Sequence, residues 1–128
     1  MPLCWRPSLT RRTHPMGKFE TKLEHSNRWH QPVRVPSNKD GIFGAAKELA
    51  EDMDGWTIQS VDEETMTIRA EKANGFLGGT SQIVVRVEGP DGIPNSETHC
   101  SSESSGALLS RDKSNVATFI EKFWMRVT

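Results

Sequence analysis

The sequence predicts a single two-layer α+β domain: an antiparallel sheet of about five strands with two helices on one face, in the order β-α-β-β-β-β-α. A chain of 128 residues fits one domain. Several consecutive segments alternate apolar and polar residues and are joined by short links, which favours antiparallel pairing. Two further segments carry apolar residues at helical spacing, so they can cover the apolar face of such a sheet.

The N-terminal region differs from the rest in charge. Residues 1–39 carry eight Lys and Arg against two Glu, a net charge of +6, whereas residues 40–128 carry a net charge of −7. We expect residues 1–15 to form a flexible basic tail and residues 16–128 to form the domain. Met1 and Met16 both remain candidates for the functional start. The basic residues are scattered, with no aromatic–basic stripe, so we expect no specific nucleic-acid partner.

Two extended segments follow the tail. Residues 18–24 alternate in polarity and predict a half-buried strand with Phe19, Thr21 and Leu23 on one face. Residues 30–38 contain two prolines and predict an extended edge segment at best.

The first helix is predicted by its boundaries and its apolar face. Ser37 and Asp40 have the S-x-x-D spacing of a capping box, and Gly55 supplies a left-handed stop after a helix that ends near Met53. The residues at helical spacing are Ile42, Ala45, Ala46, Leu49 and Met53.

Four strands are predicted next. The first three span Trp56–Val61, Thr65–Ala70 and Ser81–Gly89, and a glycine-rich loop at 72–79 precedes the third. The fourth, at 96–104, places Thr98, Cys100 and Ser102 on one face and Glu97, His99 and Ser101 on the other. Because this strand is polar, we expect that one face is wet or that the strand lies at an edge of the sheet.

The closing helix is predicted to start near Ser110–Asp112. Its apolar stripe consists of Val116, Phe119, Ile120, Phe123 and Val127.

The sequence favours a non-catalytic protein without deciding the matter. The serine-rich segment lacks the G-x-S-x-G elbow of a serine nucleophile. His99 and Cys100 are neighbours in a strand, so their side chains point to opposite faces. No His, Cys and acid cluster has metal-ligand spacing, so we expect neither a metal nor a cofactor. Cys4 and Cys100 form no CxxC motif, and we expect reduced thiols in the cytoplasm or another reducing compartment, with organellar targeting left open.

The turn between the fourth strand and the closing helix is the best candidate for a binding site. Free amides and the helix dipole favour an anion there, and Arg111 adds a bidentate donor. The same residue types also cap helices, and this structural interpretation is the one we favour. The candidate ligand-binding or anion-binding residues are Ser102, Ser104, Ser110, Arg111, Asp112 and Asn115.

The segments "GWTIQSVDEETMTIRAEKA", "SQIVVRVEG" and "SSESSGALLSRDKSNVATFIEKF", within residues 55–123, resemble the domain of unknown function 1499 family. The strongest points are Ser102-Glu103-Ser104, then Asp112 and Asn115 before an apolar helix. The resemblance implies the same order of a helix, strands and a closing helix. Serines 101 and 105 stand where the family usually has arginines, and Ser81-Gln82 where it has an acid pair. The resemblance implies no activity.

Two functions remain. The first is non-catalytic binding of a protein or small-molecule partner through the serine-rich turn and the polar edge of the sheet. The alternative is a helix-grip-like carrier of a small apolar molecule or lipid, which needs a cavity that would remove much of a small core. No apolar run approaches the roughly 20 residues of a membrane span. The oligomeric state remains open.

Overall fold

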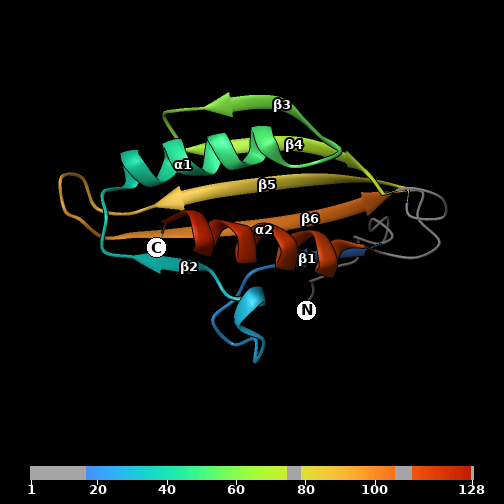
Figure 1. Ribbon diagram of the computed structural model, residues 1–128, viewed down its shortest axis with the longest axis horizontal. Coiled ribbons are helices and arrows are strands. Elements are labelled where there is room, and N and C mark those ends of the chain that lie inside the picture. The colour runs from blue at the N-terminus through green and yellow to red at the C-terminus, as the bar shows by residue number, and fades with distance from the viewer. Residues whose placement is uncertain (1–16, 75–78, 106–110, 128) are drawn as a thin grey trace, which may run out of the picture.

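The computed structural model describes residues 17–74, 79–105 and 111–127. The strands are β1 (Gly17–Glu20), β2 (Val33–Val35), β3 (Trp56–Asp62), β4 (Thr67–Ala73), β5 (Thr80–Glu88) and β6 (Ser96–Ser105). The helices are α1 (Lys39–Asp52), α2 (Asp112–Val127) and the short 3-10 helix η2 (Arg28–His30). The predicted α+β class is confirmed, with six strands instead of about five (Figure 1). The predicted tail at 1–15 lies outside the described residues.

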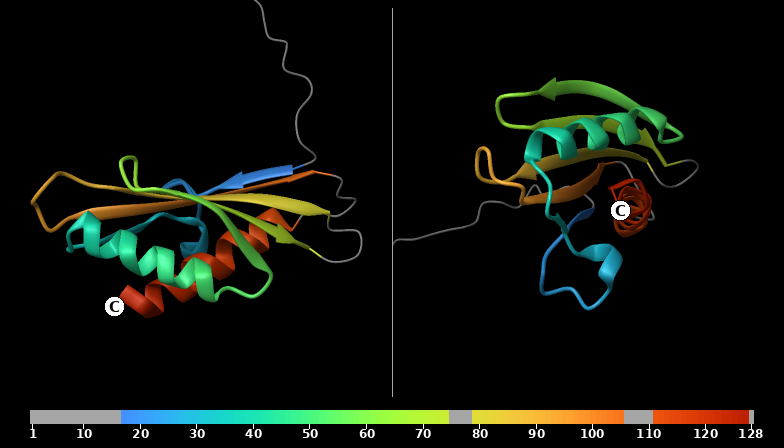
Figure 2. Two further views of the ribbon diagram at one scale, coloured as in Figure 1. Left: turned by 90° about the horizontal axis from the view of Figure 1, so that it is seen from above. Right: turned by 60° about the vertical axis from the view of Figure 1, so that its left-hand side comes forward.

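The strands form one antiparallel sheet in the order β1-β6-β5-β4-β3, and β2 also pairs with β6. Both helices lie on the same side of this sheet, as the left view of Figure 2 shows. Helix α1 packs over β3, β5 and β6, and α2 packs over β6, β1 and β2. The two predicted layers are therefore present. No helix among the described residues is long and apolar enough to cross a membrane.

Strand β6 lies inside the sheet, so the edge position that the sequence offered as one alternative is wrong. Its outward face is partly exposed, in agreement with the other alternative, a wet face. The strand pairs with β5 on one side and with β1 and β2 on the other. Its inward face is polar but buried, because several of its hydroxyls find hydrogen-bond partners beneath α2. Segment 30–38 supplies only the three-residue strand β2.

Two local predictions about the first third of the chain are wrong. Strand β1 ends at Glu20, so Leu23 falls outside the strand and is 52% exposed. The N-cap of α1 is Asn38 instead of Ser37, and its side chain makes no capping hydrogen bond. The stop after α1 is as predicted, because Gly55 has a φ of +80° that a residue with a Cβ rarely adopts.

The core lies between the helical layer and the inward face of the sheet. The Trp56 and Phe119 rings stack with centroids 5.5 Å apart, and Phe119 stacks on Phe123 at the same centroid distance. Of the predicted stripe on α2, Val127 alone is only partly buried. Buried apolar side chains from β2, α1, β4 and β5 complete one continuous cluster.

The segment between β1 and β2 packs against α2 through aromatic rings and a cation. The Arg28 guanidinium lies 5.2 Å from the ring centroid of Trp29 and 4.9 Å from that of Trp124 in α2. Burial, then the neighbouring charges of His25 and Lys113, lower the pKa of His30. These contacts tie the N-terminal strands to the closing helix.

We predict that Phe119→Ala lowers the free energy of unfolding by about 3–5 kcal/mol, because it empties the centre of the aromatic stack. Chemical denaturation followed by circular dichroism measures this change. Met125→Ala is the matched control on the same helix, since Met125 is 70% exposed, and we expect a change within about 0.5 kcal/mol. Equal effects of the two substitutions would contradict the packing described.

We also predict that Thr98→Val leaves the protein equally stable or stabilises it by about 1 kcal/mol. Thr98 is fully buried, and its Oγ1 has no hydrogen-bond partner among the described residues. Valine has nearly the same shape and removes the unsatisfied hydroxyl. A clear loss of stability in thermal or chemical unfolding would mean that this hydroxyl is satisfied.

Candidate functional site

The start of α2 is held by a buried group of side chains, the serine–aspartate cluster, consisting of Ser81, Ser102, Ser104 and Asp112. Asp112 Oδ1 accepts hydrogen bonds from Ser81 Oγ at 3.1 Å and from Ser102 Oγ at 2.6 Å. Asp112 Oδ2 accepts a hydrogen bond from Ser104 Oγ at 2.8 Å. All four residues are at most 1% exposed, so the carboxylate has exchanged water for three hydroxyl donors.

The strand register explains why the three hydroxyls meet. Ser81 of β5 lies opposite Ser104 of β6, and Ile83 lies opposite Ser102. Alternation along each strand turns these serines to the inward face, which α2 covers. The first residue of α2 then places its carboxylate above them.

Asn115, one turn along α2, connects the cluster to a lysine. Its Nδ2 group lies 3.3 Å from Ser81 Oγ, 3.3 Å from Ser102 Oγ and 3.2 Å from Asn74 Oδ1, and shares its two hydrogens among them. Its Oδ1 accepts a hydrogen bond from Lys72 Nζ at 2.8 Å. The position of the lysine therefore depends on an amide that the serines orient.

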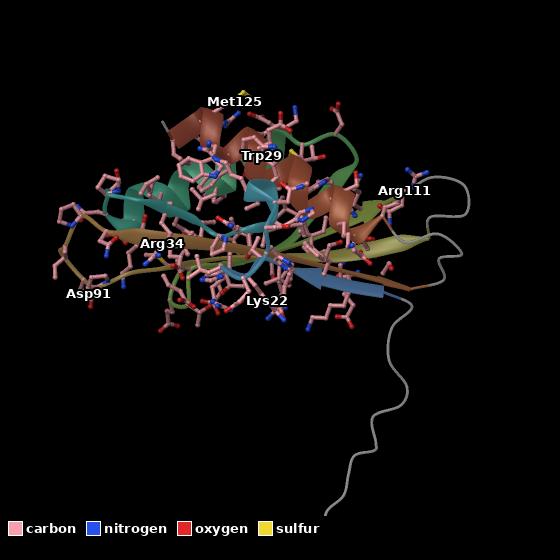
Figure 3. The ribbon with its side chains drawn as sticks, turned by 90° about the horizontal axis from the view of Figure 1, so that it is seen from below. Lys22, Trp29, Arg34, Asp91, Arg111 and Met125 are labelled. Carbon is pink, nitrogen blue, oxygen red and sulfur yellow. The ribbon has the colours of Figure 1, made fainter. Side chains whose placement is uncertain are left out.

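The structure brings together four of the six residues predicted for the turn site. Ser102, Ser104, Asp112 and Asn115 are buried and hydrogen-bonded to one another or to Ser81. Arg111 is exposed at the opposite end of α2 from Met125, as Figure 3 shows. Ser110 lies outside the described residues. Ligand binding by this set stays a prediction.

A second feature, the interhelix pocket, opens beside the cluster. It has a volume of about 580 Å³ and lies between the end of α1, the segment after it, strands β3 and β4, and α2. This volume is within the range of roughly 300–1,000 Å³ that is usual for small-molecule sites. Its lining residues are Leu49, Asp52, Met53, Asp54, Trp56, Lys72, Asn115, Thr118, Lys122, Met125 and Arg126.

Of the charged side chains that line the pocket, Arg126 has an ion-pair partner among the described residues and Lys72 has none. Arg126 Nη2 lies 3.1 Å from Asp52 Oδ2, an ion pair that joins α2 to α1. No carboxylate of the described residues lies within ion-pair distance of Lys72. Burial of the Lys72 ammonium, then the positive charge of Arg111, lower the pKa of Lys72. Lys72 is therefore a partly desolvated cation, and burial and the charge of Arg111 both disfavour its charged form.

Sequence reasoning missed Lys72, although a signal was present. The sequence predicts a strand that ends at Ala70 and places Lys72 in the following loop. Strand β4 runs to Ala73, so the inward face of Ile68 and Ala70 continues to Lys72. A lysine at an inward strand position is unusual enough to indicate a special role.

A third polar group lies elsewhere on the sheet. One ligand atom each from Glu88, Glu97 and His99 lies within 4.8 Å of the others. Glu88 pairs with Arg86 Nε at 2.6 Å, Glu97 pairs with Arg34 Nε at 3.0 Å, and His99 Nε2 lies 2.7 Å from Glu97 Oε1. These pairs account for the cluster as a charged surface network.

The neighbouring residues His99 and Cys100 lie on opposite faces of β6, as alternation predicts. His99 belongs to the surface network, whereas Cys100 is only 1% exposed. Burial raises the pKa of the Cys100 thiol far above its usual value, so this thiol is unreactive.

Comparison with solved structures shows a shared fold. The chain is similar to a structure titled "Crystal structure of Ara h 8.0201", with a TM-score of 0.51 and 16% sequence identity. The alignment covers 85% of this chain and 97% of that chain. No family model and no curated protein matches the chain, so the resemblance to the domain of unknown function 1499 family stays a prediction.

We predict that Ser104→Ala lowers the free energy of unfolding by about 1.5–3 kcal/mol, because it removes a hydrogen bond to a buried carboxylate. Ser101→Ala is the control on the outward face of β6, and we expect a change within about 0.5 kcal/mol. Urea denaturation of the two variants gives the comparison. If Ser104→Ala were as mild as Ser101→Ala, Asp112 would not depend on this donor.

Proposed function

We propose that the protein binds and carries a small, largely apolar molecule in the interhelix pocket. The observation that carries this proposal is the pocket itself, which has room for a small ligand and an apolar wall formed by Leu49, Met53 and Trp56. The pocket lies at the junction of the two helices with the sheet. The fold shared with Ara h 8.0201 is consistent with the helix-grip-like alternative that we considered from sequence.

The sequence raises one objection to a carrier, namely that a cavity for the ligand would remove much of the small hydrophobic core. The interhelix pocket avoids this cost because it lies beside the core. Phe119 and Phe123 are fully buried in that core without lining the pocket. A ligand would extend the apolar cluster where Trp56 lines the pocket, and burial of its apolar surface there is favourable.

The other hypothesis from the sequence places binding at the serine-rich turn. Its buried serines already donate their hydroxyls to Asp112, and its asparagine is held among the same side chains. A ligand there would have to replace satisfied hydrogen bonds to a buried carboxylate, which is costly. The carrier is therefore the better-supported proposal.

Blocking the pocket tests the carrier function. Thr118 is exposed on α2 and lines the pocket, so Thr118→Trp fills the space without disturbing the core. We expect saturable binding of the neutral fluorescent probe Nile red to the wild type, and an affinity reduced about tenfold or more by Thr118→Trp.

Glu121→Trp is the matched control, because Glu121 is exposed on the same helix outside the pocket. It should leave the dissociation constant within about twofold of the wild type. Absence of saturable binding to the wild type, or equal effects of the two tryptophans, would refute the proposal.

A further inference from the structure

Lys72 gives the interhelix pocket a chemical preference. Resting on the carrier function proposed above, we infer that the pocket takes a molecule with one ionised carboxylate on an apolar body, and that Lys72 binds the carboxylate. The ammonium lines the pocket and donates one hydrogen bond to Asn115 Oδ1. An ammonium has three donors, and the described residues occupy one of them, so two remain for a ligand.

The charge count favours a monoanion. Lys72, Lys122 and Arg126 contribute three positive charges to the lining, and Asp52 and Asp54 contribute two negative charges. One net positive charge remains. Since Arg126 is already paired with Asp52, the excess falls on the lysines, and Lys72 is the less exposed of the two. A single carboxylate neutralises it.

The surroundings of Lys72 make such a ligand favourable. Its ammonium is partly removed from water and has no carboxylate partner among the described residues. Burial, then the positive charge of Arg111, lower the pKa of Lys72. A carboxylate at hydrogen-bond distance would replace the lost hydration with a charge-assisted hydrogen bond. A neutral ligand of the same shape would leave the ammonium partly desolvated and without a carboxylate partner from the described residues.

The rest of the pocket defines the other end of the ligand. Leu49, Met53 and Trp56 form an apolar surface, and the Trp56 ring is supported from behind by Phe119. An alkyl chain or an aromatic ring can pack there. The serine–aspartate cluster orients Asn115, which in turn positions the Lys72 ammonium. The distance between the charged and the apolar region is thus set by the fold.

The test compares ligands that differ only in the head group. Binding of decanoate, decan-1-ol and decyl phosphate at pH 7.5 is measured by displacement of Nile red and by calorimetry. We expect the wild type to bind decanoate about tenfold more tightly than decan-1-ol. Lys72→Met should remove this preference while leaving the affinity for decan-1-ol within about twofold. Lys72→Arg, which keeps the charge, should retain most of the preference.

Lys122→Met is the matched control, because it removes a more exposed lysine from the same pocket. It should reduce the decanoate preference by less than about threefold. Circular dichroism confirms that each variant is folded, and the wild-type comparison of head groups stands even if Lys72→Met fails to fold.

The outcomes separate this inference from the carrier function. Equal affinities for decanoate and decan-1-ol would overturn the role of Lys72 while leaving the carrier intact. A Lys72→Met variant that weakens both ligands equally would do the same. Tighter, Lys72-dependent binding of decyl phosphate would overturn the choice of a carboxylate. If neither decanoate nor decan-1-ol displaces Nile red, this inference falls, whereas the carrier function falls only if Nile red itself does not bind saturably.

Discussion

The arrangement of the two layers depends on the hydrogen bonds between the buried carboxylate of Asp112 in α2 and three serines of the sheet. A carboxylate can be buried at tolerable cost only if its oxygens are fully hydrogen-bonded. Three serine hydroxyls from two neighbouring strands meet that requirement. They also fix where α2 begins and in which rotation it lies over the sheet. The apolar stripe of α2, centred on Phe119, then falls onto the core.

The same anchor shapes the candidate binding site. The first turn of α2 is held over β5 and β6, and its last turn contacts the end of α1 through Arg126 and Asp52. The space left between these elements is the interhelix pocket. Asn115 takes part in both regions, so the polar interior and the pocket are one connected structure.

The fold was predictable because periodicity reports local structure directly. Alternation identified β3 to β6, and helical spacing identified both helices and most of their buried faces. The candidate site was harder to predict from the sequence than the fold. The polarity of β6 predicted a wet face or an edge position. It did not predict that its inward serines are buried, because their acceptor, Asp112, comes from the start of the next helix and not from the strand pattern. Lys72 was not recognised as a strand residue because the glycines after it suggested that the strand ends before it.

The placement of β6 also has a consequence for how the chain assembles. Strands β3 to β6 pair with their neighbours in sequence, whereas the contact of Cys100 N with Thr21 Oγ1 joins residues 79 positions apart. Loop-closure entropy delays such distant contacts, so we expect the meander to form before β1 and β2 dock. During that interval one side of β6 is an open edge. Its serines and the charges of Glu97 and Glu103 make it a poor template for aggregation.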